Sequence, residues 1–141
     1  VYVLNEMGMS LTVFDYDAKA GAMTEIQTID TLPKELWEIP NKAAEVRVHP
    51  GGKFVYASNR GHDTIAAFSV DEGSGKLTFI EREPIRGAYP RNFNVDPTGQ
   101  WLIAAGRASN TLAVFKIDPQ TGGLIFTTDV LNVPAPICLE F

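Results

Sequence analysis

The 141-residue sequence repeats itself, and this repetition constrains the fold more than any other feature. Three stretches, YVLNEMGMSLTVF, YASNRGHDTIAAF and IAAGRASNTLAVF, each run from an apolar residue to a phenylalanine: Phe14, Phe68 and Phe115. In each copy an aspartate follows the phenylalanine by three residues, a glycine by seven and an apolar residue by nine. The first and second phenylalanines lie 54 residues apart, and the second and third lie 47 apart. Agreement at so many positions indicates one structural unit that is used repeatedly.

Each unit contains four short segments with the alternation, the β-branched residues and the bounding turns that are typical of strands. They are 44–48, 53–58, 64–70 and 76–82 in the second copy, and 91–95, 101–106, 111–117 and 123–129 in the third. Turns rich in proline and glycine, HPGG and DPTG, join the first two segments of these copies. Four antiparallel strands in about 45 residues are typical of a β-propeller blade. The sequence therefore predicts an all-β fold of propeller blades, rather than an ordinary β-sandwich.

The predicted blades divide the chain unevenly. Residues 1–42 supply strands two to four of one blade and a loop, 43–89 and 90–135 are full blades, and 136–141 supply the first strand of a further blade. A propeller typically closes with about 4–8 blades. We therefore expect the ring to need missing N-terminal blades or another chain, because open strand edges are otherwise left uncovered.

Four stretches carry a resemblance to a known family: YVLNE (2–6), 44–68 with its SNRG motif, 87–105 and VPAPICLEF (133–141). In these stretches the chain resembles the C-terminal portion of the seven-bladed propeller lactonases, which include 6-phosphogluconolactonases and carboxy-muconate cyclases. The resemblance implies a seven-bladed ring that acts on a small anionic sugar lactone or carboxylate, with no cofactor and no metal. A histidine and an arginine of the family's proposed catalytic set would precede Val1. The chain alone is therefore expected to be inactive.

Polar residues collect where the predicted second strands end, as in SNRGHD. Because the first two strands of a blade are antiparallel, these positions and the starts of the first strands share one mouth of the ring, and loops held by rigid strands often carry function. The resemblance places Glu6 and Arg60 in the catalytic set. The carboxylate would activate water as a general base, and the arginine would polarise the lactone carbonyl and bind the anionic group. Residues expected to bind substrate at this mouth are Asn5, Asn59, His62, Arg91 and Glu45.

Other interpretations stay open for these residues and for the activity. Arg60 could be solvated, and Arg60 or Arg91 could bridge neighbouring blades. Asn5 and Asn59 could form turns. His62 could lie exposed in a loop. Arg60 is expected in a loop, so that its removal would leave folding nearly unchanged. One interpretation of the activity is hydrolysis of a sugar lactone such as 6-phosphogluconolactone. A second is a muconate-type lactonizing cyclase that uses the same groups. A non-enzymatic binding or scaffold module is the third alternative.

Composition narrows the partners and the compartment. The net charge of -5 argues against binding to nucleic acid or to an anionic membrane surface. The single cysteine, Cys138, cannot form an internal disulfide, which favours a reducing, cytoplasmic location. Its apolar neighbours predict that it packs in a core. His49 belongs to a turn at the end opposite the predicted mouth and is expected to be structural.

Overall fold

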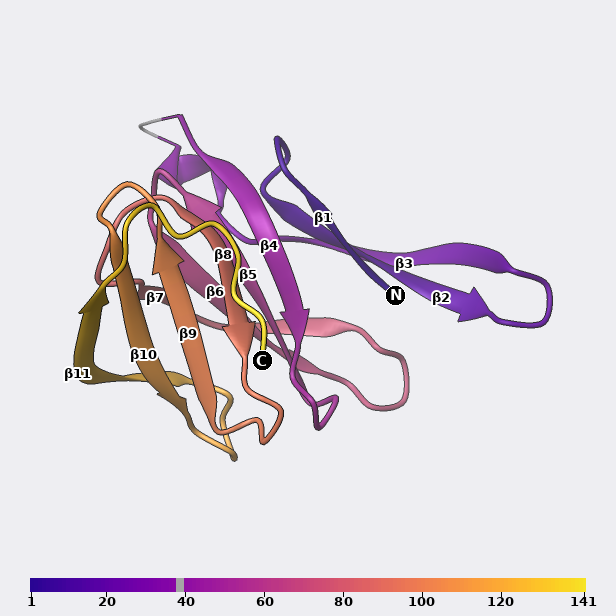
Figure 1. Ribbon diagram of the computed structural model, residues 1–141. Coiled ribbons are helices and arrows are strands. Elements are labelled where there is room, and N and C mark those ends of the chain that lie inside the picture. The colour runs from indigo at the N-terminus through magenta and orange to yellow at the C-terminus, as the bar shows by residue number, and fades with distance from the viewer. Residues whose placement is uncertain (38–39) are drawn as a thin grey trace.

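The computed structural model describes residues 1–37 and 40–141, which form three antiparallel sheets (Figure 1). The first sheet has three strands, β1 (Tyr2–Asn5), β2 (Ser10–Asp17) and β3 (Ala22–Asp30). A short 3-10 helix, η1 (Lys34–Leu36), follows it. The second sheet has four strands, β4 (Lys42–Val48), β5 (Phe54–Arg60), β6 (Thr64–Val70) and β7 (Leu77–Pro84). The third also has four, β8 (Pro90–Val95), β9 (Trp101–Gly106), β10 (Thr111–Ile117) and β11 (Leu124–Asn132).

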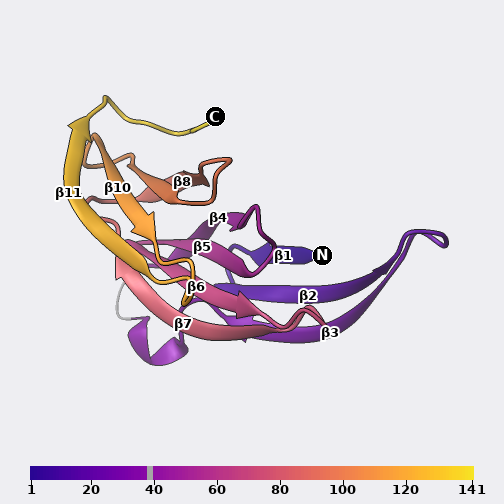
Figure 2. The same ribbon diagram turned by 90° about the horizontal axis from the view of Figure 1, so that it is seen from below.

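Within each sheet the strands are neighbours in chain order, as in propeller blades. Figure 2 shows the three sheets fanning out, with β1, β4 and β8 toward one side and β3, β7 and β11 along the outer arc. β4 lies against both β1 and β8. The prediction of an all-β fold built from propeller blades is confirmed, and the strands predicted within residues 1–135 match those of the structure to within a few residues, whereas the strand predicted at 136–141 is not formed.

The middle blade is buried on both faces, because it lies between the first and the third sheets. The side chains of each strand alternate between these two faces. In β5, Phe54 and Tyr56 join a core shared with the third sheet, whereas Val55 and Ala57 join a core shared with the first sheet. β6 divides in the same way between the two cores. Every residue of β5 is buried, including its last, Arg60. The near-continuous apolar run KFVYA is thus the signature of a strand between two blades.

The repeated aspartates and glycines shape the outer hairpin loops. The side-chain Oδ1 of Asp17, Asp71 and Asp118 accepts backbone N–H groups two or three residues further on. The glycines of the repeat close these loops with positive φ, at 63°, 72° and 75° for Gly21, Gly75 and Gly122. Only glycine takes this conformation without steric penalty, so the loop geometry explains why both residue types recur at fixed spacing.

His49 is structural, as predicted. Its Nδ1 accepts the Gly51 N–H at 2.9 Å, and its Nε2 lies 2.9 Å from the Gly99 carbonyl of the next blade. The ring also packs edge-on against Phe54. The imidazole therefore ties together the two turns that the sequence analysis recognised as HPGG and DPTG.

The C-terminal segment, residues 136–141, lies along β8 without forming a regular strand (Figure 1). The Leu139 N–H donates to the side chain of Asn92, and the Asn94 side chain donates to the Leu139 carbonyl. The expectation that Cys138 packs in a core is wrong, because its side chain is exposed. The apolar neighbours misled here, since Ile137 is exposed as well. No helix in the described parts of the chain is long and apolar enough to cross a membrane.

Candidate active site

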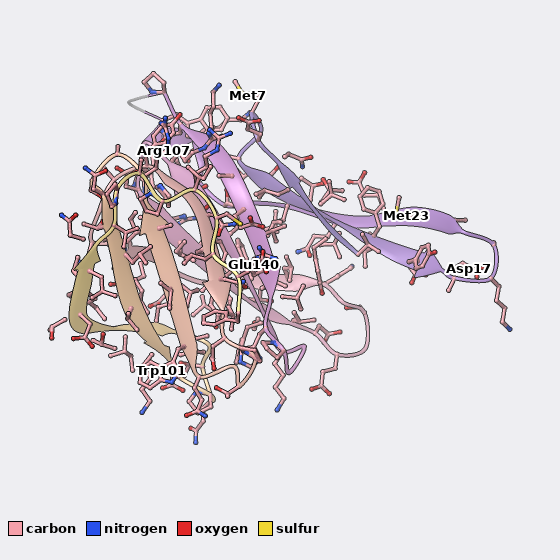
Figure 3. All side chains as sticks on the ribbon, in the orientation of Figure 1. Met7, Asp17, Met23, Trp101, Arg107 and Glu140 are labelled. Atoms are coloured by element: carbon pink, nitrogen blue, oxygen red, sulfur yellow. The ribbon has the colours of Figure 1, made fainter. Side chains whose placement is uncertain are left out.

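A polar cavity of about 380 Å³ opens at one end of the blades. Its charged lining residues are Glu6, Glu45, Arg60 and Arg91, and the remainder comes from Leu4, Ala43, Ala44 and Val46. β4 forms one wall and carries Glu45, while the other charges come from just after β1, the end of β5 and the start of β8. Figure 3 shows that Met7, the neighbour of Glu6, and Arg107 mark this end of the blades, whereas Trp101 marks the other. The cavity therefore forms where the antiparallel geometry of strands one and two predicted a shared mouth.

Arg60 and Glu6 form an ion pair at this cavity. Nη2 of Arg60 donates to Oε1 of Glu6 at 2.7 Å and to the carbonyl oxygen of Ala43 at 3.0 Å. The Ala43 N–H in turn donates to the Glu6 carbonyl oxygen, so β4 positions both members of the pair. The expectation that Arg60 lies in a loop is wrong: it is the last residue of β5 and only 8% exposed.

The two partners differ in their access to solvent. The Glu6 side chain is 57% exposed, whereas the Arg60 side chain is 10% exposed. A further contact covers the guanidinium, because its carbon lies 5.3 Å from the centre of the Tyr89 ring. Glu6 can therefore meet water and ligands from the open side, while Arg60 is held by three neighbours.

Arg91 is the second arginine of the cavity lining. It is exposed on β8, and its guanidinium makes no hydrogen bond or ion pair with the described residues. An exposed guanidinium whose donors are not used by the described residues can bind a phosphate or carboxylate with two parallel hydrogen bonds. The cavity thus offers one arginine that is committed to Glu6 and one that is available to an anionic ligand.

Glu45 lines the cavity, but its carboxylate already has partners. Oε2 accepts a hydrogen bond from the Asn92 side chain, and Oε1 lies 3.6 Å from Nε of Arg47. Asn92 also holds the C-terminal segment through Leu139. Glu45 therefore shapes the wall, and its negative charge is partly balanced by Arg47.

The structure does not bring Asn5, Asn59 or His62 to the cavity. Asn59 is fully buried, where its side chain accepts from the Thr31 hydroxyl at 2.7 Å and donates to the Thr31 carbonyl. Asn5 donates to the hydroxyls of Ser10 and Thr12 within the first hairpin. His62 bonds Thr64 two residues on. Asn5 thus serves its own hairpin, as the alternative of a turn-forming asparagine implied, whereas Asn59 joins neighbouring blades and His62 is half-buried and not exposed.

The sequence analysis missed Tyr89, which lies before the proline of YPRNF. No pattern in the sequence marks a loop tyrosine as the partner of an arginine 29 positions earlier. No group of three or more histidine, cysteine, aspartate or glutamate side chains that could hold a metal ion occurs in 1–37 or 40–141.

A second cavity, of about 570 Å³, lies at the opposite end of the second and third blades. His49, Lys53, Thr98, Gln100 and Lys116 are among its polar lining residues, and no carboxylate lines it. The first cavity has an exposed carboxylate beside an arginine, which is the combination that acid–base and electrostatic catalysis uses. We therefore take the first cavity as the candidate active site.

Comparison with known proteins identifies the family of the chain. The model of the family "Lactonase, 7-bladed beta-propeller" matches residues 1–141. A 6-phosphogluconolactonase from Bacillus subtilis (strain 168) is 36% identical over 140 residues, which is 99% of this chain and 40% of the relative. Another 6-phosphogluconolactonase, from Pectobacterium carotovorum, is 36% identical over 95 residues, which is 67% of this chain and 28% of the relative.

Solved structures give the same result. The crystal structure of a putative 6-phosphogluconolactonase from Bacteroides fragilis superposes with a TM-score of 0.90 at 34% identity, covering 99% of this chain and 37% of that one. The periplasmic gluconolactonase PpgL from Pseudomonas aeruginosa gives a TM-score of 0.91 at 31% identity, covering 99% and 38%. The chain thus spans about two fifths of the length of the first relative that it matches. It belongs to the seven-bladed β-propeller lactonase family.

Proposed function

We propose that the intact protein hydrolyses a sugar lactone such as 6-phosphogluconolactone. The observation that carries this proposal is the Glu6–Arg60 pair at a polar cavity that also holds the free guanidinium of Arg91. The names of the relatives, 6-phosphogluconolactonase and gluconolactonase, support hydrolysis over the muconate-type cyclisation. A protein that only binds its ligand is the remaining alternative, and it would show no turnover of any lactone.

The proposed reaction assigns Glu6 the role of general base. Water attacks the lactone carbonyl carbon, and the exposed carboxylate of Glu6 accepts one of its protons. Negative charge develops on the carbonyl oxygen and is stabilised by Arg60. When the bond between the carbonyl carbon and the ring oxygen breaks, the proton held by Glu6 passes to the ring oxygen, which becomes a hydroxyl of the product acid. Each atom of water is thereby accounted for in the product.

Arg91 is proposed to bind the anionic group of the substrate. It is the only charged residue of the cavity lining whose side chain makes no ion pair or hydrogen bond with the described residues. A phosphate in contact with Arg91 would place the substrate across the cavity toward Glu6 and Arg60. This assigns anion binding to Arg91 and charge stabilisation to Arg60, which the sequence analysis had combined in Arg60.

The 141 residues alone are proposed to be inactive. They span about two fifths of the Bacillus relative, and a seven-bladed ring would complete the cavity with groups from its other blades. The proposed function is therefore tested by an assay of the intact protein. The substrates are 6-phosphogluconolactone and unphosphorylated gluconolactone, and the release of acid is measured for both.

Arg91→Ala is expected to raise KM for the phosphorylated lactone at least about 10-fold while leaving KM for gluconolactone nearly unchanged. Lys53→Ala removes the same charge at the opposite cavity and serves as the matched control. An intact protein that turns over neither lactone would overturn the proposed function. Equal effects of the Arg91 substitution on both lactones would overturn the role of Arg91.

A further inference from the structure

The guanidinium of Arg60 has donors that the protein itself leaves unused. Nη2 is occupied by Glu6 and the Ala43 carbonyl, and Nε is buried without a partner. Nη1 donates to none of the described residues and is not buried like Nε. Nη1 is therefore the group that Arg60 can present to a ligand, and its direction depends on the plane in which the guanidinium is held.

Tyr89 covers this guanidinium from the next blade. The guanidinium carbon lies 5.3 Å from the ring centre, within the range of a cation–π contact. The Tyr89 hydroxyl donates to and accepts from none of the described residues. The ring, and not the hydroxyl, is thus the part of Tyr89 that contacts the site.

The backbone of Tyr89 is held in an unusual conformation. Its φ is +64°, which is rare for a bulky residue with a side chain and marks a place where the surrounding structure imposes the geometry. The Tyr89 N–H donates to Oδ1 of Asp63 at 2.8 Å, and its carbonyl accepts the Arg107 N–H at 3.2 Å. Both anchors fix the peptide groups that carry the ring.

Asp63 connects this anchor to the segment that carries Arg60. Its Oδ1 also accepts the Gly61 N–H at 3.1 Å, and its carbonyl accepts the Ile85 N–H at 3.0 Å. Asp63 itself has a φ of +56°. One carboxylate oxygen thus joins the residue after Arg60 to the residue whose ring covers Arg60, so the two cannot move independently.

We propose that Tyr89 is a positioning residue for Arg60: its ring fixes the guanidinium plane so that Nη1 points into the cavity, and Asp63 holds the ring there. This inference rests on the proposed function. Because negative charge develops on the lactone carbonyl oxygen only as the transition state forms and not in the bound substrate, loss of this orientation lowers kcat more than it raises KM. If Tyr89 contributed to packing alone, its replacement would change stability without lowering kcat more than it raises KM.

The experiment replaces Tyr89 in the intact protein by phenylalanine and by phenylalanines that carry one, two and three fluorines. Fluorine withdraws charge from the ring face at nearly constant shape, so folding is preserved while the cation–π contact weakens. We expect Tyr89→Phe to retain kcat, because the hydroxyl is unused. We expect kcat to fall with each added fluorine, by about 10-fold in total. KM should stay within about twofold. A kcat that does not depend on fluorination would overturn the proposal.

A second measurement does not need lactone turnover. In protein labelled with ¹⁵N-arginine, the side-chain signal of Arg60, assigned by its loss in Arg60→Lys, should be resolved and displaced by the ring current of Tyr89. It should remain displaced in Tyr89→Phe and collapse toward the position of free arginine in Tyr89→Leu. An unchanged signal in Tyr89→Leu would overturn the positioning role. If the intact protein is not a lactonase, the function fails while this readout still decides whether Tyr89 fixes Arg60.

Discussion

Oε1 of Glu6, just after β1, lies 2.7 Å from Nη2 of Arg60, the last residue of β5. The two residues are 54 positions apart, which is the distance between the first two copies of the repeat. They therefore occupy equivalent places in neighbouring blades, where one copy has a glutamate and the next an arginine. The repeat thus places an anionic and a cationic side chain in contact by changing the residue type at one position of the blade.

We predict that Glu6→Gln lowers lactone turnover by the intact protein at least about 100-fold, the size of effect expected for a lost general base. Glutamine keeps an oxygen that can accept from Arg60, so the thermal unfolding temperature should change little. The rate is measured by acid release and the unfolding by circular dichroism. Turnover equal to that of the unchanged protein would remove Glu6 from the reaction.

Arg60→Ala is predicted to affect both turnover and stability. Turnover should fall at least about 100-fold, as for the loss of an electrostatic stabiliser. Stability should fall by about 1–3 kcal/mol, because the Ala43 carbonyl loses a buried donor. Chemical denaturation of the intact variant measures the second effect. A variant as stable as the parent would show that the hydrogen bond from Arg60 to the Ala43 carbonyl does not contribute to folding.

Much of the site could be predicted from the sequence, and the exceptions have physical reasons. Strand ends follow from the repeat, so the placing of Glu6, Glu45, Arg60 and Arg91 at one mouth follows from antiparallel pairing alone. Which way a polar side chain points at that mouth does not follow. Asn59 turns into the gap between blades because Thr31, from the loop after β3, offers both a donor and an acceptor there.

The residues that contact the charged side chains could not be predicted from the sequence either. Tyr89 lies over Arg60 while its N–H donates to Asp63, a contact between the β5–β6 turn and the β7–β8 loop. Cys138 is exposed although its segment is held to the third sheet, because the contacts that hold the segment come from the Leu139 backbone and from the Glu140 side chain, which lies 3.6 Å from Arg47. Such contacts depend on the packing of one blade on the next, which the pattern within one blade does not contain.

Gly61 is predicted to be far less replaceable than Gly21, although both have positive φ. A Cβ on Gly61 would lie 2.5 Å from the Pro40 carbonyl oxygen, whereas a Cβ on Gly21 would meet nothing within 4 Å. Gly21→Ala should cost about 1 kcal/mol of stability from the backbone conformation alone. Gly61→Ala should cost at least about twice as much. Denaturation midpoints of the two variants provide the test, and equal values would contradict the proposed close approach.

Asp96 is predicted to contribute to stability near neutral pH and to lose this contribution in acid. Partial burial raises the pKa of the Asp96 carboxyl, but hydrogen bonds from Thr98, Trp101 and Gln100 outweigh it and hold the pKa below its ordinary value of 3.8. Since the unfolded chain then binds more protons than the folded one around this pH, lowering the pH through about 4 favours unfolding. Unfolding free energies measured between pH 3 and 7 should therefore fall less steeply in Asp96→Asn than in the parent. Parallel curves would show that the Asp96 carboxylate does not contribute in this way.

The last prediction concerns the 141 residues produced on their own. The first sheet has three strands, with β1 at one of its edges, whereas the other two sheets have four strands each. Val3 on this edge strand and Tyr16 and Met23 on the neighbouring hairpin are exposed. Open edges beside apolar surface promote pairing with another chain. We therefore expect the isolated chain to self-associate, with a mass by light scattering that rises with concentration. Val3→Lys should reduce this association, because a charge on an edge strand opposes pairing, whereas Leu36→Lys in η1 should not. A chain that stays monomeric at all concentrations would show that the first sheet needs no further strand.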